Sequence, residues 1–174
     1  MPAQQTRRPP QPVHTPNYDD IGSASGTRGG VRFATGNHRV RVTRVIDKHS
    51  QKDSARLFII ETEVIKSGNP ALEIGDRPSS VIKFGQYPKM SLGDVADFMR
   101  AALASLSCSN GVFETPESVE LTPAIANEVS GEDNICVGVE LDVYGYHKTP
   151  DTDFVSLTWS VPKDIAQAAA AKGA

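Results

Sequence analysis

Cysteine is scarce in this sequence, and the two that occur do not form a metal-site pattern. Cys108 and Cys136 belong to no Cys-x-x-Cys pair and to no Cys/His cluster with metal-ligand spacing. Each lies in or beside an apolar periodic segment, so we expect two buried, reduced thiols. A disulfide between them is the less favoured alternative.

Long apolar runs are also lacking. No stretch approaches the roughly 20 consecutive apolar residues that a membrane helix needs. The N-terminal sequence MPAQQTRRPPQPVHTP has no hydrophobic segment of the signal-peptide type. Both absences predict a soluble protein of the cytoplasm, with no membrane partner.

The sequence contains no recognisable catalytic motif. Its four histidines are scattered, and it contains no HExxH motif and no nucleophile elbow. No Ser/His/Asp catalytic set can be identified from the sequence. Glu61 and Glu63 are two residues apart, and so are Glu140 and Asp142. This spacing places each pair on one face of a strand, which is usually the solvated face of a sheet. These patterns favour a binding protein over an enzyme, with no cofactor and no metal.

Positive charge is concentrated at the start of the chain. The first 44 residues hold seven arginines against two aspartates, a net charge of +5, which leaves −8 for the remainder of a chain whose total is −3. A basic segment of this kind binds an anionic polymer or an acidic protein face. The charge pattern alone leaves both partners open.

The composition divides the chain into three parts. Residues 1–35 are rich in Pro, Gly, Ser, Thr and Arg without an apolar period, which predicts a flexible basic arm. Residues 36–162 show strand and helix periodicities and are expected to form one domain of ordinary size. Residues 163–174 are expected to be a C-terminal tail.

Alternating apolar residues predict five strands in the domain. The segments are 39–46, 55–66, 80–84, 134–148 and 153–161, with polar or turn-rich connections. In the fourth segment Val137, Val139, Leu141 and Val143 are expected to face inward. The nine residues expected to be mostly buried are Phe58, Ile60, Val64, Met99, Leu103, Val139, Leu141, Leu157 and Trp159.

One substantial helix is predicted between the third and fourth strands. It begins at Ser91, a favourable N-cap, and ends at Leu106, with an apolar stripe at helical spacing. Thr115-Pro116 and Thr122-Pro123 each place a cap residue before a proline, which predicts two short helical turns. The expected fold is therefore dominated by β-structure: a five-stranded, partly open barrel of the OB type with one main helix.

The order of these features resembles a phage-encoded family of small single-stranded DNA-binding proteins with an OB-like fold. The likeness covers roughly residues 36–162. It rests on GNHRVRVTRVID, RLFIIETEVIKS, GDRPSSVIKF, MSLGDVADFMRAALASL, and the hairpin VGVELDVYGYHK to FVSLTWSVP. The resemblance implies binding of single-stranded DNA without sequence specificity, in replication or recombination, and is compatible with a homo-oligomer.

Single-stranded DNA binding needs cations along the backbone and aromatic faces for the bases. Residues of both kinds occur at strand positions and strand ends. The predicted nucleic-acid-binding residues are Arg39, Arg41, Arg56, Lys83, Tyr87, Tyr144, Tyr146 and Lys148.

A structural protein of a virion is the alternative function. A Pro-rich, Arg-bearing arm that lies across neighbouring subunits would become ordered on binding. In this interpretation the chain decorates or helps assemble a capsid and docks on other viral proteins. The predicted partner-binding residues of the arm are Arg7, Arg8, Arg28 and Arg32.

Overall fold

The computed structural model describes residues 31–50, 54–85, 88–131, 133–151 and 154–173 of the 174-residue chain. Within these ranges strands come first, helices follow, and a final hairpin and helix close the order. The elements are β1 (Gly36–His49), β2 (Arg56–Ser67), β3 (Ser79–Phe84), α1 (Pro88–Ser109), the 3-10 turn η2 (Pro116–Ser118), α2 (Pro123–Ser130), β4 (Glu140–His147), β5 (Val155–Ser160) and α3 (Lys163–Gly173).

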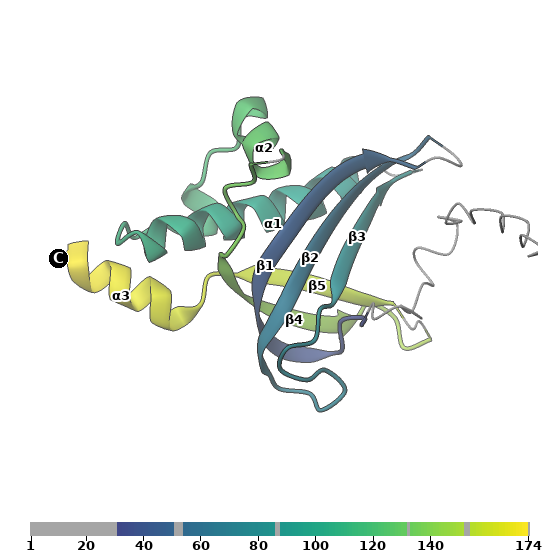
Figure 1. The fold of residues 1–174 in the computed structure, drawn as a ribbon, viewed down its shortest axis with the longest axis horizontal. Coiled ribbons are helices and arrows are strands. Elements are labelled where there is room, and N and C mark those ends of the chain that lie inside the picture. Colours follow the sequence, from purple (N-terminus) through teal and green to yellow (C-terminus); the bar gives the residue numbers. More distant parts are fainter. Residues whose placement is uncertain (1–30, 51–53, 86–87, 132, 152–153, 174) are drawn as a thin grey trace, which may run out of the picture.

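The strands form one antiparallel sheet in the order β3-β2-β1-β4-β5. The central strand β1 pairs with both β2 and β4, and its pairing with β2 shifts register twice, between Arg39 and Val40 and between Val42 and Arg44. Such irregularities bend a strand and increase its twist. In Figure 1, β1, β2 and β3 run side by side while β4 and β5 cross them at an angle. The sheet thus curves into a partly open, OB-like barrel, which confirms the predicted fold class.

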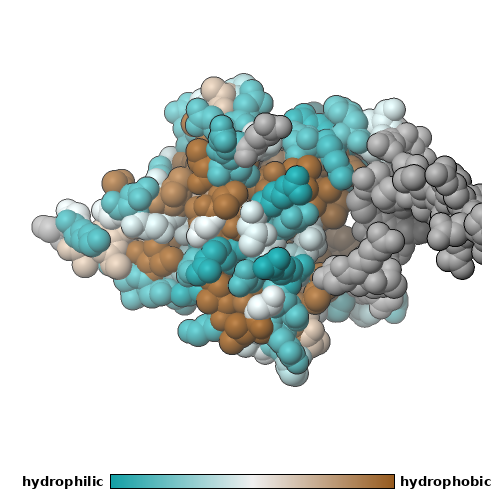
Figure 2. Space-filling model, viewed as in Figure 1, coloured by the Kyte–Doolittle hydropathy of each residue, from teal (hydrophilic) through white to brown (hydrophobic). Residues whose placement is uncertain are grey.

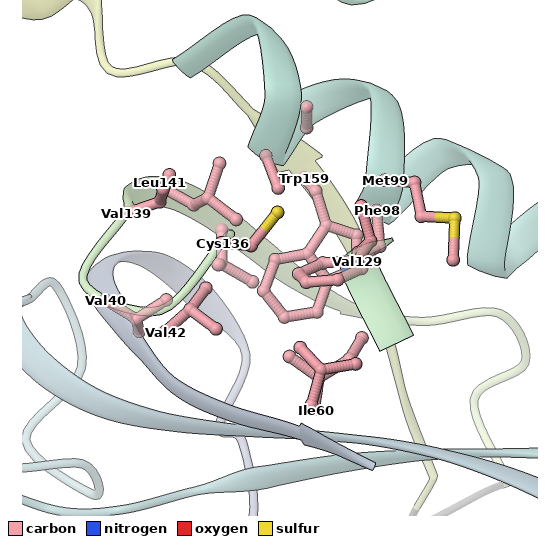
Figure 3. Close-up of a cluster of buried hydrophobic side chains, with 14 of the residues drawn as sticks. Val40, Val42, Ile60, Phe98, Met99, Val129, Cys136, Val139, Leu141 and Trp159 are labelled. Carbon is pink, nitrogen blue, oxygen red and sulfur yellow. The ribbon is translucent and has the colours of Figure 1, made fainter. Parts of the chain in front are cut away.

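Helix α1 covers the concave side of the sheet and completes the core. Phe98, fully buried on α1, lies between Phe58 of β2 and Trp159 of β5, with ring centroids 6.0 and 5.2 Å away in edge-to-face geometry. Edge-to-face pairs add to the stabilisation from burial alone. Figure 3 shows Phe98 and Trp159 among valine, leucine and methionine side chains from both layers. Seven of the nine residues predicted as core are buried, and Leu103 and Leu157 are partly buried.

The two helical turns predicted from threonine-proline pairs are present, but only the side chain of Thr122 caps its turn with a hydrogen bond. The main helix is longer than predicted. The Thr122 hydroxyl accepts a hydrogen bond from the Ile125 amide at the start of α2, and Thr115 precedes η2. Helix α1 starts three residues before Ser91 and ends three residues after Leu106. The Ser91 hydroxyl donates to the carbonyl oxygen of Lys83, so this side chain ties α1 to β3 and does not cap the helix start.

Two segments outside the predicted domain pack on it. Val31 forms a parallel bridge with Pro78, and Phe33 is buried with its ring 6.0 Å from that of Trp159. His38 Nε2 donates to the Ala34 carbonyl oxygen at 3.0 Å, which fastens this segment further. The body therefore includes residues 31–35, which the composition had assigned to the arm. The expected C-terminal tail contains helix α3, which contacts α1.

One predicted inward position is wrong. Val137 is exposed because β4 begins only at Glu140, and residues 134–139 form a turn in which Gly138 has a φ of 88°. The alternation of Val137 with Val139 therefore does not reflect a strand at that point. Val139, Leu141 and Val143 are buried as expected.

We expect Phe98→Ala to lower the free energy of unfolding by about 3–5 kcal/mol, because it leaves a cavity between two rings. Urea denaturation followed by the fluorescence of Trp159 measures this loss. Phe113→Ala removes the same atoms from a residue that is 52% exposed, and should change stability by less than about 0.5 kcal/mol. Equal losses in the two variants would show that Phe98 does not hold the core.

Candidate functional site

The convex face of β1 and β4 carries several of the predicted binding residues. The pairing register places Asn37 opposite Tyr144, Arg39 opposite Asp142, and Arg41 opposite Glu140. Residues two apart on a strand share a face, so all six side chains lie on one surface, away from the core residues Val40 and Leu141. Cations, carboxylates and tyrosines are therefore adjacent there.

Arg39 is held by two carboxylates. Its guanidinium donates to Asp142 at 2.8 and 3.2 Å and to Asp164, at the start of α3, at 2.7 and 2.9 Å. These hydrogen bonds raise the pKa of Arg39 and lower that of Asp164. The side chain of Arg39 is only 17% exposed. Arg39 therefore connects α3 to the sheet and offers few free donors to a phosphate.

Arg41 and Arg56 are also paired. Arg41 Nη2 donates to Glu140 at 3.0 Å, and Arg56 donates to both oxygens of Asp47 while its guanidinium lies 5.6 Å from the centre of the Phe84 ring. The hydrogen bonds from Arg56 to Asp47 raise the pKa of Arg56. Arg56 lies at the far end of β2, opposite His49, and is thus separated from Arg39 along the sheet.

Tyr144, which is exposed, and Tyr146, which is half-buried, form an aromatic platform on β4. Their rings stack with centroids 6.0 Å apart and an interplanar angle of 14°, and Tyr144 is 50% exposed. Between them Gly145 faces the core, where a Cβ atom would collide with the Ala34 carbonyl and the Val155 side chain. Glycine at this position lets the segment 31–35 approach β4 closely. The arrangement offers flat apolar surface to a planar ligand.

Exposed cations also occur on this face, at partly different positions from those predicted. Lys148 lies two residues after Tyr146, Lys66 lies opposite Arg39, and Arg44 lies opposite Glu61, toward the other end of β1 from the tyrosines. In the part of the chain that the structure describes, none of these three has an ion-pair partner within 4 Å. Lys66 was not predicted because a single exposed lysine at a strand end carries no distinguishing pattern.

A groove of about 1050 Å³ lies between the two edge strands, β3 and β5, along α1. Lys83, Tyr146 and Lys148, three predicted residues, line it. Its helix side is acidic. The carboxylates there are Asp94 and Asp97 on α1 and Glu114 and Glu117 in the segment that follows, with Arg100 only 3.9 Å from Asp97.

The acidic side of the groove was missed by sequence reasoning. Asp94, Asp97 and Arg100 recur every three residues on the polar side of an amphipathic helix, which is also the pattern of an ordinary solvated face. Their meeting with β5 depends on packing between segments far apart in sequence. Phe113 and Phe154, both exposed, also line the groove.

The remaining predicted residues divide into two groups. Arg32 is described, and its side chain is exposed beside the buried Phe33. Tyr87, Arg7, Arg8 and Arg28 lie outside the described residues. The structure therefore brings together Arg39, Arg41 and Tyr144 on one face, and Lys83, Tyr146 and Lys148 around the groove.

Both cysteines are buried and free, as predicted from their apolar surroundings. Burial raises the pKa of the Cys136 thiol to about 12, so at neutral pH this residue is a neutral core side chain. Figure 3 shows it pointing into the hydrophobic cluster.

In the described ranges no three His, Cys, Asp or Glu residues are placed to hold a metal ion. No helix among the described residues is long and apolar enough to cross a bilayer.

Comparison with known proteins gives no assignment of family. No protein-family model matches the chain, and no curated protein matches it.

The pKa of Asp164 tests the link between α3 and the sheet. We expect a midpoint below the usual value of about 3.9 in the native chain, and a return toward that value in Arg39→Gln, because the hydrogen bonds from Arg39 favour the ionised carboxylate. The stabilisation from this pair is present above the unfolded-state pKa and is lost as the pH falls through the lowered native pKa. NMR titration of the carboxyl carbon measures both midpoints.

Arg41→Gln is the matched control, since Arg41 pairs with Glu140 and not with Asp164. It should leave the midpoint of Asp164 unchanged. The same midpoint in all three proteins would contradict the proposed connection.

Proposed function

We propose that this chain binds single-stranded DNA without strong sequence preference, with Tyr144 and Tyr146 as the platform on which bases stack. One observation carries the proposal: the ring of Tyr144, which is 50% exposed, stacks on that of the half-buried Tyr146, and the exposed Lys148 lies two residues beyond this pair. The partly open OB-like sheet is an architecture that often binds nucleic acids. The resemblance of the sequence to phage single-stranded DNA-binding proteins supports the same function, in replication or recombination.

The cations proposed to contact phosphates differ from those first predicted. Arg39, Arg41 and Arg56 already form ion pairs, so binding a phosphate would require breaking an existing contact. The exposed Lys148, Lys66 and Arg44 do not carry that cost. We therefore propose that these three residues provide most of the electrostatic contribution on this face.

The aromatic contribution is tested by Tyr144→Ala and Tyr146→Ala. Because stacking contributes about 1–3 kcal/mol per base, each change should weaken binding of fluorescent oligo-dT by about 5-fold to 150-fold. Val137→Ala is the control, as it removes exposed apolar atoms from the turn before β4, and Val137 does not line the groove that Tyr146 lines. Equal affinities of the native chain and the two tyrosine variants would contradict the proposal.

Salt titrations test the cationic contribution. The double change Lys66→Gln with Lys148→Gln should reduce the slope of log K against log salt by about 0.7 for each phosphate that a lysine no longer neutralises. The tyrosine variants should leave that slope nearly unchanged, because stacking releases few counterions. A slope that the lysine changes do not alter would show that phosphates bind elsewhere on the chain.

The virion structural role is the second candidate. The acidic side of the groove between β3 and β5 favours it, since carboxylates repel phosphates and attract basic polypeptides. The arm residues that would dock on neighbouring subunits lie outside the described residues, except Arg32. Failure of the full chain to shift oligo-dT in a gel at low salt would make this second candidate the better account.

A further inference from the structure

A row of three residues crosses the convex face at Tyr144. The pairing register places Asn37 of β1 opposite Tyr144 on one side and Thr158 of β5 opposite it on the other. Residues directly opposite each other in an antiparallel pair have Cβ atoms about 4.5–5.5 Å apart. All three residues are exposed. The ring proposed to stack a base is thus bordered on both sides by a side chain that can form hydrogen bonds.

The side chain of Asn37 has no hydrogen-bond partner among the residues that the structure describes. Its backbone is held on both sides, because the Gly68 amide donates to its carbonyl oxygen at 2.8 Å and β1 pairs it with Tyr144. Asparagine is depleted in strands and favoured in turns, where its side chain bonds to the nearby backbone. Asn37 lies in a strand and makes no such bond, so the fold itself does not require an amide here.

A base that stacks on Tyr144 needs polar partners as well as an aromatic face. Stacking against a partly apolar surface removes polar atoms of the base from water, and these atoms need hydrogen bonds in exchange. Figure 2 shows hydrophilic residues bordering hydrophobic ones over one face of the molecule, so apolar and polar contacts are close together there. At Tyr144 the free amide of Asn37 provides the polar contact.

An amide matches the edge of any unpaired base. Its carbonyl oxygen accepts and its NH2 group donates, both in one plane. The Watson–Crick edge of every base offers a donor next to an acceptor: N3–H and O4 in thymine, N4–H and N3 in cytosine, N6–H and N1 in adenine, and N1–H and O6 in guanine. Rotation of the side-chain amide by half a turn exchanges its donor and its acceptor. The Thr158 hydroxyl offers a single atom and cannot match both groups at once.

We propose that Asn37 hydrogen-bonds to the Watson–Crick edge of the base stacked on Tyr144, and thereby selects unpaired bases without selecting among them. The inference rests on the proposed function, because it needs a base on Tyr144. In a duplex this edge is occupied by the complementary base, so the contact favours single strands. A polar contact of this kind leaves the sequence preference weak.

The test compares a short oligo-dT with the same oligonucleotide made of N3-methylthymidine, each titrated into the full-length chain by fluorescence anisotropy. Methylation removes the N3–H donor and leaves the ring face for stacking, so the native chain should bind the methylated oligonucleotide more weakly. Asn37→Ala should weaken binding of oligo-dT about 2-fold to 12-fold, the usual effect of one hydrogen bond. It should not weaken binding of the methylated oligonucleotide. Asn127→Ala removes the same amide from an exposed position on α2 and should change neither affinity.

The variant Tyr144→Ala separates this inference from the proposed function. It should weaken binding of both oligonucleotides, because stacking uses the face of the base. If Tyr144→Ala weakens binding of oligo-dT and Asn37→Ala does not, stacking stands and the contact from Asn37 is overturned. Equal weakening of both oligonucleotides by Asn37→Ala would also overturn it, since the loss would not depend on the base edge. Equal affinities of the native chain and Tyr144→Ala would refute the proposed function, and this inference with it.

Discussion

The contact of Phe98 with Phe58 and Trp159 is the constraint on which the rest of the structure depends. Phe58 lies on β2 and Trp159 on the edge strand β5, and these strands are not neighbours in the sheet. By packing between them, a single side chain of α1 holds the sheet in its curved form. The same contact places α1 along the opening between β3 and β5, so the core determines the position and the acidic side of the groove.

Ion pairing then divides the surface into regions with different chemistry. Three arginines that look available in the sequence are neutralised by carboxylates on the same or a neighbouring element. What remains on the convex face is the stacked pair Tyr144 and Tyr146 with the exposed Lys148 and Lys66, whereas the groove is lined by four carboxylates together with Lys83, Arg100 and Lys148.

Local patterns predicted most of the fold. The five strands, the main helix and the threonine-proline caps follow from alternation, helical spacing and capping chemistry, each of which involves residues close in sequence. Helix α3 was missed because DIAQAAAAK has helix-forming residues but only a weak apolar stripe. Its link to the sheet depends on Arg39 and Asp164, which are 125 residues apart.

The candidate site was less predictable than the fold because it depends on contacts between residues far apart in the sequence. Sequence alone identified Tyr144, Tyr146 and Lys148 as an aromatic and basic strand end, and in the structure the two tyrosine rings stack while Tyr146 and Lys148 also line the groove. It could not show that Arg39 and Arg41 are paired with acids about 100 residues away. Nor could it show that β3 and β5 border one groove, because that depends on the curvature of the whole sheet.

The central claim of the proposal is that single-stranded DNA stacks on Tyr144 and Tyr146 of β4. Hydrogen-exchange mass spectrometry of the full chain with saturating oligo-dT tests this most directly. The account predicts slower exchange around Glu140–His147, with exchange near Asp94 and Asp97 on α1 unchanged. Slower exchange along α1 and β5, without an effect on β4, would place DNA in the groove and contradict the account.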